Sequence, residues 1–195
     1  MVNILGIKFG RYILYELCCP VQPSDVVFDS DVQLVTRYDQ LKKNTLGILR
    51  ESMDRLLLNY TDLFVYFEDD FPLGMMWGHR GSCFIRGPGI PLFQDEETVY
   101  WFWIYTVPYA RGKNIYKKLR NSFFSHYKEI KKFTALVEPD NAIMIGEMSK
   151  MGFVEAKRYF YVKFGDNSLL YEKCGKSQNS SIHLENGNRH KLLLI

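Results

Sequence analysis

The chain has 195 residues, which is long for one small domain and short for two, so we expect one main domain with terminal extensions. Hydrophobic residues make up 47% of the chain, enough for a buried core, and this excludes a wholly disordered protein. The 25 basic and 22 acidic residues nearly balance, so the overall charge does not indicate nucleic-acid binding.

The cysteine pattern and the hydropathy of the chain predict a soluble protein with reduced thiols. The four cysteines form no C-x-x-C pair, and a chain of this size does not need a disulfide framework. No apolar run reaches the roughly 20 residues that span a bilayer, and the first residues lack the pattern of a signal peptide. We therefore expect a cytoplasmic protein with no metal site and no membrane contact.

Strand and helix patterns alternate in the first third of the chain. Tyr12–Cys18 and Val32–Tyr38 are rich in β-forming residues and predict two strands. From Asp39 to Asn59, apolar residues recur at helical spacing and predict one or two amphipathic helices. If the pattern is broken, Asp54 is the expected cap of the second helix.

The middle of the chain has the pattern of a hairpin followed by a buried strand. Phe64–Glu68 and Leu73–His79 flank a short acidic turn and predict two antiparallel strands. Arg80–Pro91 is rich in glycine and proline and predicts a loop or an extension. Thr98–Val107 is apolar on both faces, which is typical of a central strand that is covered on each side.

The remaining elements complete a mixed α/β pattern. A helix is expected at Ile115–Ile130, and a strand follows at Phe133–Val137. The crossover through this helix predicts that the strand runs parallel to Thr98–Val107. A second helix and a final pair of strands are expected at Asn141–Lys150, Phe153–Phe164 and Ser168–Lys173.

A basic loop, Pro108–Asn114, joins the long strand to the first of these helices. A strand-to-helix turn exposes backbone N–H groups at the positive end of the helix dipole, which favours a bound phosphate. Gly112 permits close approach of the backbone, and Arg111 and Lys113 add positive charge. The loop therefore predicts an anion site, for a diphosphate, although a solvated basic turn has the same composition.

Two stretches of the sequence resemble the GNAT superfamily of N-acyltransferases. The first, Arg111–Tyr116, is similar to the acyl-coenzyme A-binding motif, with Asn114 in place of the usual glycine and Tyr116 in place of Gly or Ala. Asparagine tolerates a positive φ at the lowest cost after glycine, so the loop can keep its shape. The second, Val137–Phe153, resembles the family's next strand end and helix. In it Asn141 either caps the helix or binds the pantetheine arm.

The resemblance covers about Phe64–Lys173 and implies a fold. That fold is GNAT-like and α/β, with a mixed central sheet flanked by helices and a splayed pair formed by the strand ending at Val107 and Phe133–Val137. We expect one domain over residues 1–175 and a weakly ordered tail over 176–195. The implied coenzyme-binding residues are Tyr105, Thr106, Val107, Arg111, Gly112, Lys113, Asn114, Ile115, Tyr116 and Asn141.

The resemblance also implies an activity. An N-acetyltransferase of this type moves an acetyl group from its co-substrate acetyl-coenzyme A to a primary amine of a small molecule, sugar or peptide, within a ternary complex. Met148 occupies the position of the family's general-acid tyrosine, so proton transfer falls to other groups, and the candidates are Glu97, Glu68 and Tyr161.

Two other functions fit the sequence less well. One is a coenzyme A-binding sensor or interaction module that has lost its chemistry, suggested by Asn114 and Met148. The other is a nucleic-acid-binding module, against which the balanced charge counts. We expect a monomer or a homodimer.

Overall fold

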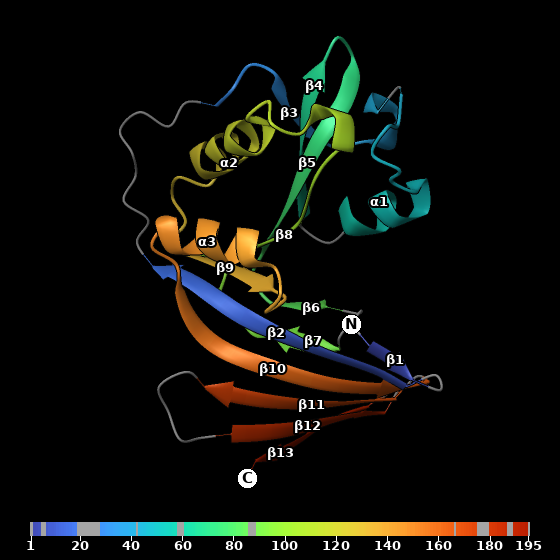
Figure 1. Cartoon of the computed structure of the whole chain (residues 1–195), viewed down its shortest axis with the longest axis vertical. Coiled ribbons are helices and arrows are strands. Elements are labelled where there is room, and N and C mark those ends of the chain that lie inside the picture. Colours follow the sequence, from blue (N-terminus) through green and yellow to red (C-terminus); the bar gives the residue numbers. More distant parts are fainter. Residues whose placement is uncertain are drawn as a thin grey trace. The chain divides into compact units, whose positions relative to one another are not determined.

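The computed structural model describes most of the chain (Figure 1). The chain divides into two compact units. Unit 1 consists of Met1–Cys18, Ser82–Gln94 and Thr134–Ile195, and unit 2 of Cys19–Gly81 and Asp95–Phe133. No helix in the described part of the chain is long and apolar enough to cross a membrane. The described residues are 2–4, 7–18, 28–41, 43–57, 61–85, 89–165, 167–174, 180–186 and 189–194.

Unit 2 contains strands in the order β8-β5-β4-β3, each antiparallel to its neighbour. The predicted hairpin is confirmed: β4 and β5 are joined by Asp69 and Asp70, whose φ angles of 50° and 67° suit a two-residue turn. The elements of this unit are β3 (Val32–Val35), α1 (Arg50–Leu57), β4 (Thr61–Glu68), β5 (Phe71–Arg80), β8 (Thr98–Thr106) and α2 (Ile115–His126).

Helix α2 packs directly on the backbone of β5 because two residues of that strand have no side chain. A Cβ atom on Gly74 would lie 2.6 Å from Cγ2 of Ile115, and one on Gly78 would lie 2.8 Å from the hydroxyl of Tyr127. Phe123 of α2 is fully buried between these contacts. The two glycines thus fix where α2 begins and how closely it approaches the sheet.

The segment predicted as one or two helices from Asp39 to Asn59 differs from the prediction. In the described part of this segment, only a 3₁₀ turn (Tyr38–Gln40) and the eight-residue α1 form, and the described residues between them are irregular. The side chain of Asn44 bonds both the N–H (3.2 Å) and the C=O (2.6 Å) of Ile48, which replaces helical hydrogen bonds, and Gly47 has a φ of +67°. Asp54 therefore lies inside α1 and caps no second helix.

Two other elements in unit 2 end earlier than expected. The strand predicted to reach Tyr38 ends at Val35, and the helix predicted to reach Ile130 ends at His126. Beyond His126, the N–H of Tyr127 still bonds Phe123, but its φ and ψ of −96° and 32° leave the helical region.

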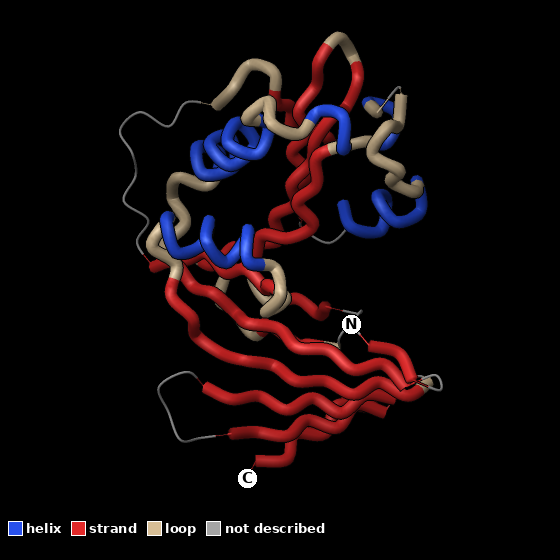
Figure 2. The backbone as a smooth tube through the Cα atoms, viewed as in Figure 1, coloured by secondary structure: helices blue, strands red, loops and turns tan. Residues whose placement is uncertain are grey.

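Unit 1 is a largely antiparallel sheet with one helix, α3 (Ala142–Lys150), drawn in blue in Figure 2. The long N-terminal strand β2 (Ile7–Cys18) lies between β9 (Lys132–Val137) and β10 (Val154–Phe164), although it is far from both in sequence. β11 (Asn167–Cys174) pairs with β10 and confirms the predicted final hairpin. The φ of +83° at Gly152 ends α3 as expected.

Unit 1 also contains strands that the sequence did not indicate. β1 (Val2–Ile4) pairs with β2, and β6 (Cys83–Ile85) with β7 (Ile90–Leu92) in the expected loop region. β12 (Ser180–Asn186) and β13 (Arg189–Leu194) extend the sheet where a weakly ordered tail was expected. The loop predicted at Cys19–Ser24 lies outside the described residues, and the boundary of a single domain at residue 175 stays a prediction.

A polar cluster joins the start of β4 to the end of α2. The hydroxyl of Tyr127, itself 3% exposed, donates a hydrogen bond to Asp62, and Nε2 of His126 lies 3.5 Å from the same carboxylate. Burial alone would raise the pKa of Asp62, but hydrogen bonds from His126 and Tyr127 outweigh it, and the pKa is lowered.

Replacing Asp62 by alanine is therefore expected to cost about 1–3 kcal/mol of unfolding free energy, because the buried hydroxyl of Tyr127 loses its acceptor. Asp62→Asn keeps an acceptor and removes the charge. Because the pKa of Asp62 is lower in the folded state, its carboxylate stabilises the folded protein at pH values above the unfolded-state pKa of about 3.9. This contribution is lost as the pH falls through the folded-state pKa. When the free energy of unfolding is measured in urea between pH 7 and pH 3, it should fall less for Asp62→Asn than for the parent. An equal fall with pH in the two proteins would contradict the expectation.

Candidate functional site

The basic loop after β8 has the backbone shape that the sequence predicted. Gly112 has a φ of +84° and Asn114 a φ of +60°, so asparagine takes up the left-handed conformation expected of it. Apart from Gly112 and its two chain neighbours, no atom of the described residues lies within 4 Å of the position where Gly112 would carry a Cβ, so the backbone there is open to a ligand.

Helix α2 begins at this loop without a side-chain cap. Asn114 occupies the cap position, but its side chain accepts no hydrogen bond from the first turn, and the first helical bond runs from the N–H of Lys118 to the C=O of Asn114 at 3.1 Å. An uncapped helix start presents backbone donors and a partial positive charge to the solvent. This is the chemistry of an anion site, and a phosphate suits it.

Cationic side chains surround the same turn. Nε of Arg111 donates to the C=O of Thr106 at 3.4 Å, which holds the guanidinium near the end of β8. Nζ of Lys113 lies 2.8 Å from Glu68, and this carboxylate raises the pKa of Lys113, which stays protonated. Both members of this pair are about half exposed, so the pair orients the ammonium group and adds little stability.

Strand β8 contains a bulge just before the loop. Met75 and Trp77 of β5 face Tyr105 and Phe102 of β8, so β8 has one extra residue between these pairs. Trp103 lies in the bulge with a φ of +48°, which is rare for a bulky side chain. Its indole is 49% exposed and stacks on Trp77 with ring centroids 6.2 Å apart. Strain of this kind, of order 1–3 kcal/mol, persists only where surrounding contacts enforce it.

Of Tyr105, Thr106 and Val107, which the resemblance implied as coenzyme-binding residues, Val107 has its backbone groups already engaged. The N–H of Val107 donates to Leu73 at 2.9 Å, and its C=O accepts from Ala110 at 3.0 Å. Both backbone groups of Val107 are therefore engaged inside unit 2. Pairing of an added strand with β8 would use Tyr105 and Thr106.

The three proton-transfer candidates belong to three different parts of the chain. Glu68 ends β4 and contacts the basic loop through Lys113. Glu97 precedes β8, at the opposite end of that strand, about 30 Å of extended chain from Val107, and pairs with Lys131 at 2.8 Å. Tyr161 belongs to β10 in unit 1 and is 2% exposed. Within unit 2, the structure brings Glu68 to the loop and leaves Glu97 at the far end of β8.

The second motif forms the start of α3 in unit 1. Oδ1 of Asn141 accepts a hydrogen bond from the N–H of Met144 at 3.2 Å, so Asn141 is the helix cap. Its contact with a pantetheine arm stays a prediction, as does the splay between β8 of unit 2 and β9, most of which lies in unit 1. Met148 is fully buried and provides no proton-donating group.

Sequence reasoning missed two features of these units. The bulge at Trp103 leaves no trace in the pattern of the strand, because every residue of that run is a good β-former. The second is a hydrogen bond from Tyr12 to Glu138 at 3.3 Å, beside Gly10 and Tyr161. The isolated Gly10 inside a β-forming run was an available signal, since such a glycine often marks a close approach.

Comparison with solved structures identifies the fold. The chain is similar to a GNAT-family acetyltransferase from Novosphingobium aromaticivorans, with a TM-score of 0.58 and 11% identity over 83% of this chain and 68% of that one. It also resembles a tandem GNAT protein from the clavulanic acid biosynthesis pathway, with a TM-score of 0.54 and 13% identity over 80% of this chain. A GNAT-family acetyltransferase from Colwellia psychrerythraea gives a TM-score of 0.50 and 17% identity over 83% of this chain.

The chain spans only 54% and 57% of the length of the last two proteins. No protein-family model and no curated protein matches the sequence. At these identities the likeness establishes the fold alone. The protein has the fold of the GNAT acetyltransferases.

Proposed function

We propose that the protein is an acetyl-coenzyme A-dependent N-acetyltransferase that acetylates a primary amine of a small molecule. One observation carries the proposal: helix α2 starts without a side-chain cap, behind a basic loop whose Gly112 and Asn114 have positive φ. This is a site for a diphosphate, which coenzyme A contains, and it follows the bulged strand β8. The GNAT fold supports the same interpretation.

The reaction follows from the chemistry of a thioester and an amine. The nitrogen lone pair of the neutral amine attacks the acetyl carbonyl carbon, the C–S bond breaks, and the sulfur leaves as a thiolate that takes up a proton. A ternary complex supplies proximity, so no side chain needs to form a covalent intermediate. A backbone N–H beside the carbonyl stabilises the developing oxyanion, and the bulge removes Trp103 and Ile104 from the β5 ladder.

Proton transfer is assigned to the candidates according to their surroundings. Glu68 is the proposed base in unit 2, because it lies at the same end of the sheet as the loop. Tyr161 of unit 1 stays a candidate donor, and burial raises the pKa of its hydroxyl, which stays protonated. Glu97 stays a candidate, with its carboxylate paired to Lys131.

The bulge is expected to matter for turnover. Glycine adopts a positive φ without strain, so Trp103→Gly should keep the bulge, whereas the β-branched residue in Trp103→Val should destroy it. Loss of an oxyanion donor costs about 10²–10³ in kcat, so we expect kcat of Trp103→Val to fall at least about tenfold below that of Trp103→Gly. Equal kcat values for the two variants would contradict a role for the bulge.

The function is tested by titrating acetyl-coenzyme A into the protein by calorimetry and then following free thiol release with a panel of sugar, peptide and aromatic amines. Binding together with amine-dependent thiol release is the expected result. Binding without release on any amine would favour the sensor. No binding would contradict both.

A further inference from the structure

Strand β8 holds one large aromatic side chain out in the solvent. Trp103 is 49% exposed, whereas the other two tryptophans of the chain, Trp77 and Trp101, are 0% and 1% exposed. Its φ of +48° costs a bulky residue energy, and glycine would adopt the same conformation without strain. Backbone strain of this kind is concentrated at binding and catalytic sites, so the position is a candidate for one.

The bulge in β8 places this indole at the end of a stack of rings. Successive side chains of a strand normally point to opposite faces of the sheet. Phe102 and Trp103 are adjacent, yet both rings stack on Trp77, with centroids 6.3 and 6.2 Å away and interplanar angles of 26° and 19°. The extra residue of the bulge permits this exception. Tyr100 in turn stacks on Phe102 at 5.2 Å and 3°. Four rings thus form one stack, and Trp103 is its exposed end.

The surroundings of the indole suit an aromatic ring better than a sugar. Trp77 is fully buried, so the ring behind the indole is fixed, and a ligand meets a surface that is already ordered. The chain neighbours Phe102 and Ile104 are both apolar. A sugar must bond its hydroxyl groups or lose their hydration, whereas an aromatic ring gains from a stacked partner alone.

The exposed indole also lies near the backbone at which the reaction is proposed to occur. Two residues of chain separate Trp103 from Tyr105, a distance of no more than about 7 Å. Tyr105 and Thr106 are the residues with which an added strand, such as the pantetheine arm, would pair on β8. An aromatic ring on the indole that carries its amine on a short chain would therefore present the nitrogen to a thioester beside Tyr105.

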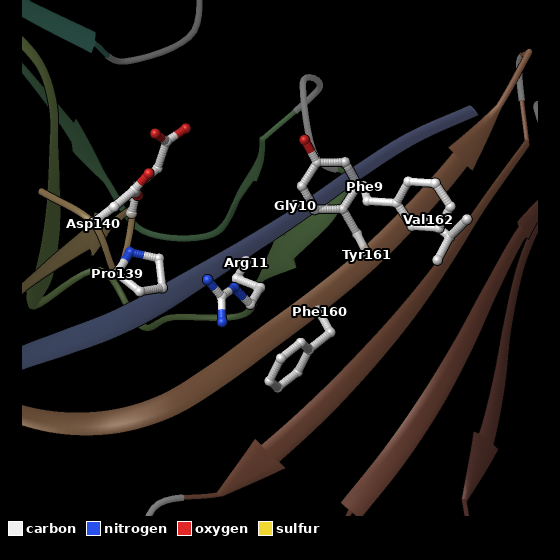
Figure 3. A pocket seen from close by; sticks show the side chains of 9 residues that line it. Phe9, Gly10, Arg11, Pro139, Asp140, Phe160, Tyr161 and Val162 are labelled. Carbon is white, nitrogen blue, oxygen red and sulfur yellow. The ribbon is translucent and has the colours of Figure 1, made fainter. Parts of the chain in front are cut away.

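Unit 1 contains a hollow of about 390 Å³ that also has aromatic rings in its wall (Figure 3). Its lining combines two rings, one cation and two carboxylates, from Phe9, Phe160, Arg11, Glu138 and Asp140. These opposed charges do not select an amine, since Arg11 repels the ammonium form that a free amine takes in water. The hollow is the competing site for such a ligand, and Phe160, which is 40% exposed, is the ring that tests it.

We propose that the acetyl acceptor is a primary amine that carries an aromatic ring on a short chain, and that this ring stacks on Trp103. The role of this amine as the acceptor rests on the proposed function. Recognition of the ring stands on unit 2 alone, through an exposed indole that a strained bulge holds out and that Trp77 supports from behind.

The test uses the tryptophan fluorescence of the full chain. Because Trp77 and Trp101 are buried, quenching of this fluorescence by acrylamide reports on Trp103. Addition of 2-phenylethylamine should protect the indole from acrylamide. The saturated analogue 2-cyclohexylethylamine has the same chain and amine without an aromatic ring, and it should bind about twofold to tenfold more weakly, the difference that a stacked pair makes. Glucosamine should not protect. Absence of protection by 2-phenylethylamine, or equal protection by either of the other amines, overturns the proposal.

Matched variants locate the ring that binds. Trp103→Gly removes the indole and suits the positive φ, so calorimetry should show binding of 2-phenylethylamine at least about tenfold weaker than in the parent. Trp103→Phe keeps a smaller ring and should lose only part of the affinity. Phe160→Ala, in the hollow of unit 1, should bind as the parent does. Circular dichroism confirms that each variant is folded. Unchanged binding by a folded Trp103→Gly protein, or a loss in Phe160→Ala instead, overturns the proposal.

A parallel titration with acetyl-coenzyme A separates the two proposals. Protection of Trp103 by 2-phenylethylamine without any coenzyme binding would leave the aromatic site standing and contradict the proposed function. Coenzyme binding and thiol release with equal KM values for 2-phenylethylamine and 2-cyclohexylethylamine would contradict the aromatic site alone.

Discussion

Replacing Gly112 by aspartate is expected to weaken acetyl-coenzyme A binding by at least about 100-fold, or roughly 2.7 kcal/mol. The new carboxylate would stand where the backbone is now open, beside the proposed diphosphate, and two like charges about 4 Å apart near a protein surface repel by about 4 kcal/mol. Calorimetric titration measures the loss. A dissociation constant within a factor of three of the parent would contradict the assigned site.

Two neutral substitutions in the same loop separate charge from backbone strain. Gly112→Ala adds no charge, and its new methyl group contacts no neighbour. The positive φ at this position should therefore cost only about 1 kcal/mol of unfolding free energy. Asn114→Gly relieves the positive φ at the helix start and should bind the coenzyme at least as tightly as the parent. A loss in Asn114→Gly as large as that in Gly112→Asp would mean that the Asn114 side chain itself binds.

Replacing Gly74 by alanine is expected to cost about 1–3 kcal/mol of unfolding free energy, because the new methyl group would lie 2.6 Å from Cγ2 of Ile115. Ile115 is the first residue of α2, directly after the coenzyme loop. The strain should therefore also weaken coenzyme binding, although Gly74 does not belong to the loop. Denaturant unfolding and calorimetry measure the two effects.

A second substitution tests this cause. Ile115→Leu removes the Cγ2 methyl group, so the double variant Gly74→Ala/Ile115→Leu should recover part of the lost stability. The coupling energy of the double-mutant cycle should be about 0.5–3 kcal/mol in the stabilising direction. Strictly additive effects would show that the methyl contact does not position α2.

The coenzyme loop could be predicted from the sequence because its determinants are local. A positive φ at Gly112 and Asn114, the helix start at Ile115 and the basic residues on either side all follow from the identities of adjacent residues. The hairpin with Asp69 and Asp70 in its turn is equally local. The conformation of the loop and that of the turn are each determined by residues only a few positions apart.

Features decided by distant partners could not be predicted. β2 lies between β9 and β10, and its pairing with β10 joins residues about 150 positions apart. Nothing in the sequence of β2 indicates which strands will be its neighbours. The hydrogen bond from Tyr12 to Glu138 joins two residues 126 positions apart. The residues after Asp39 have the apolar spacing of a helix, but the side chain of Asn44 forms hydrogen bonds with the backbone N–H and C=O of Ile48 in place of helical bonds.

The proposed coenzyme site depends on backbone amides at the start of α2 that bind a diphosphate. The most direct measurement compares ¹H–¹⁵N spectra of the protein with coenzyme A and with pantetheine, which has the same thiol-bearing arm and no diphosphate. We predict large shifts of the Gly112 and Lys113 amides with coenzyme A and little change there with pantetheine. Unshifted loop amides at saturating coenzyme A would contradict the account.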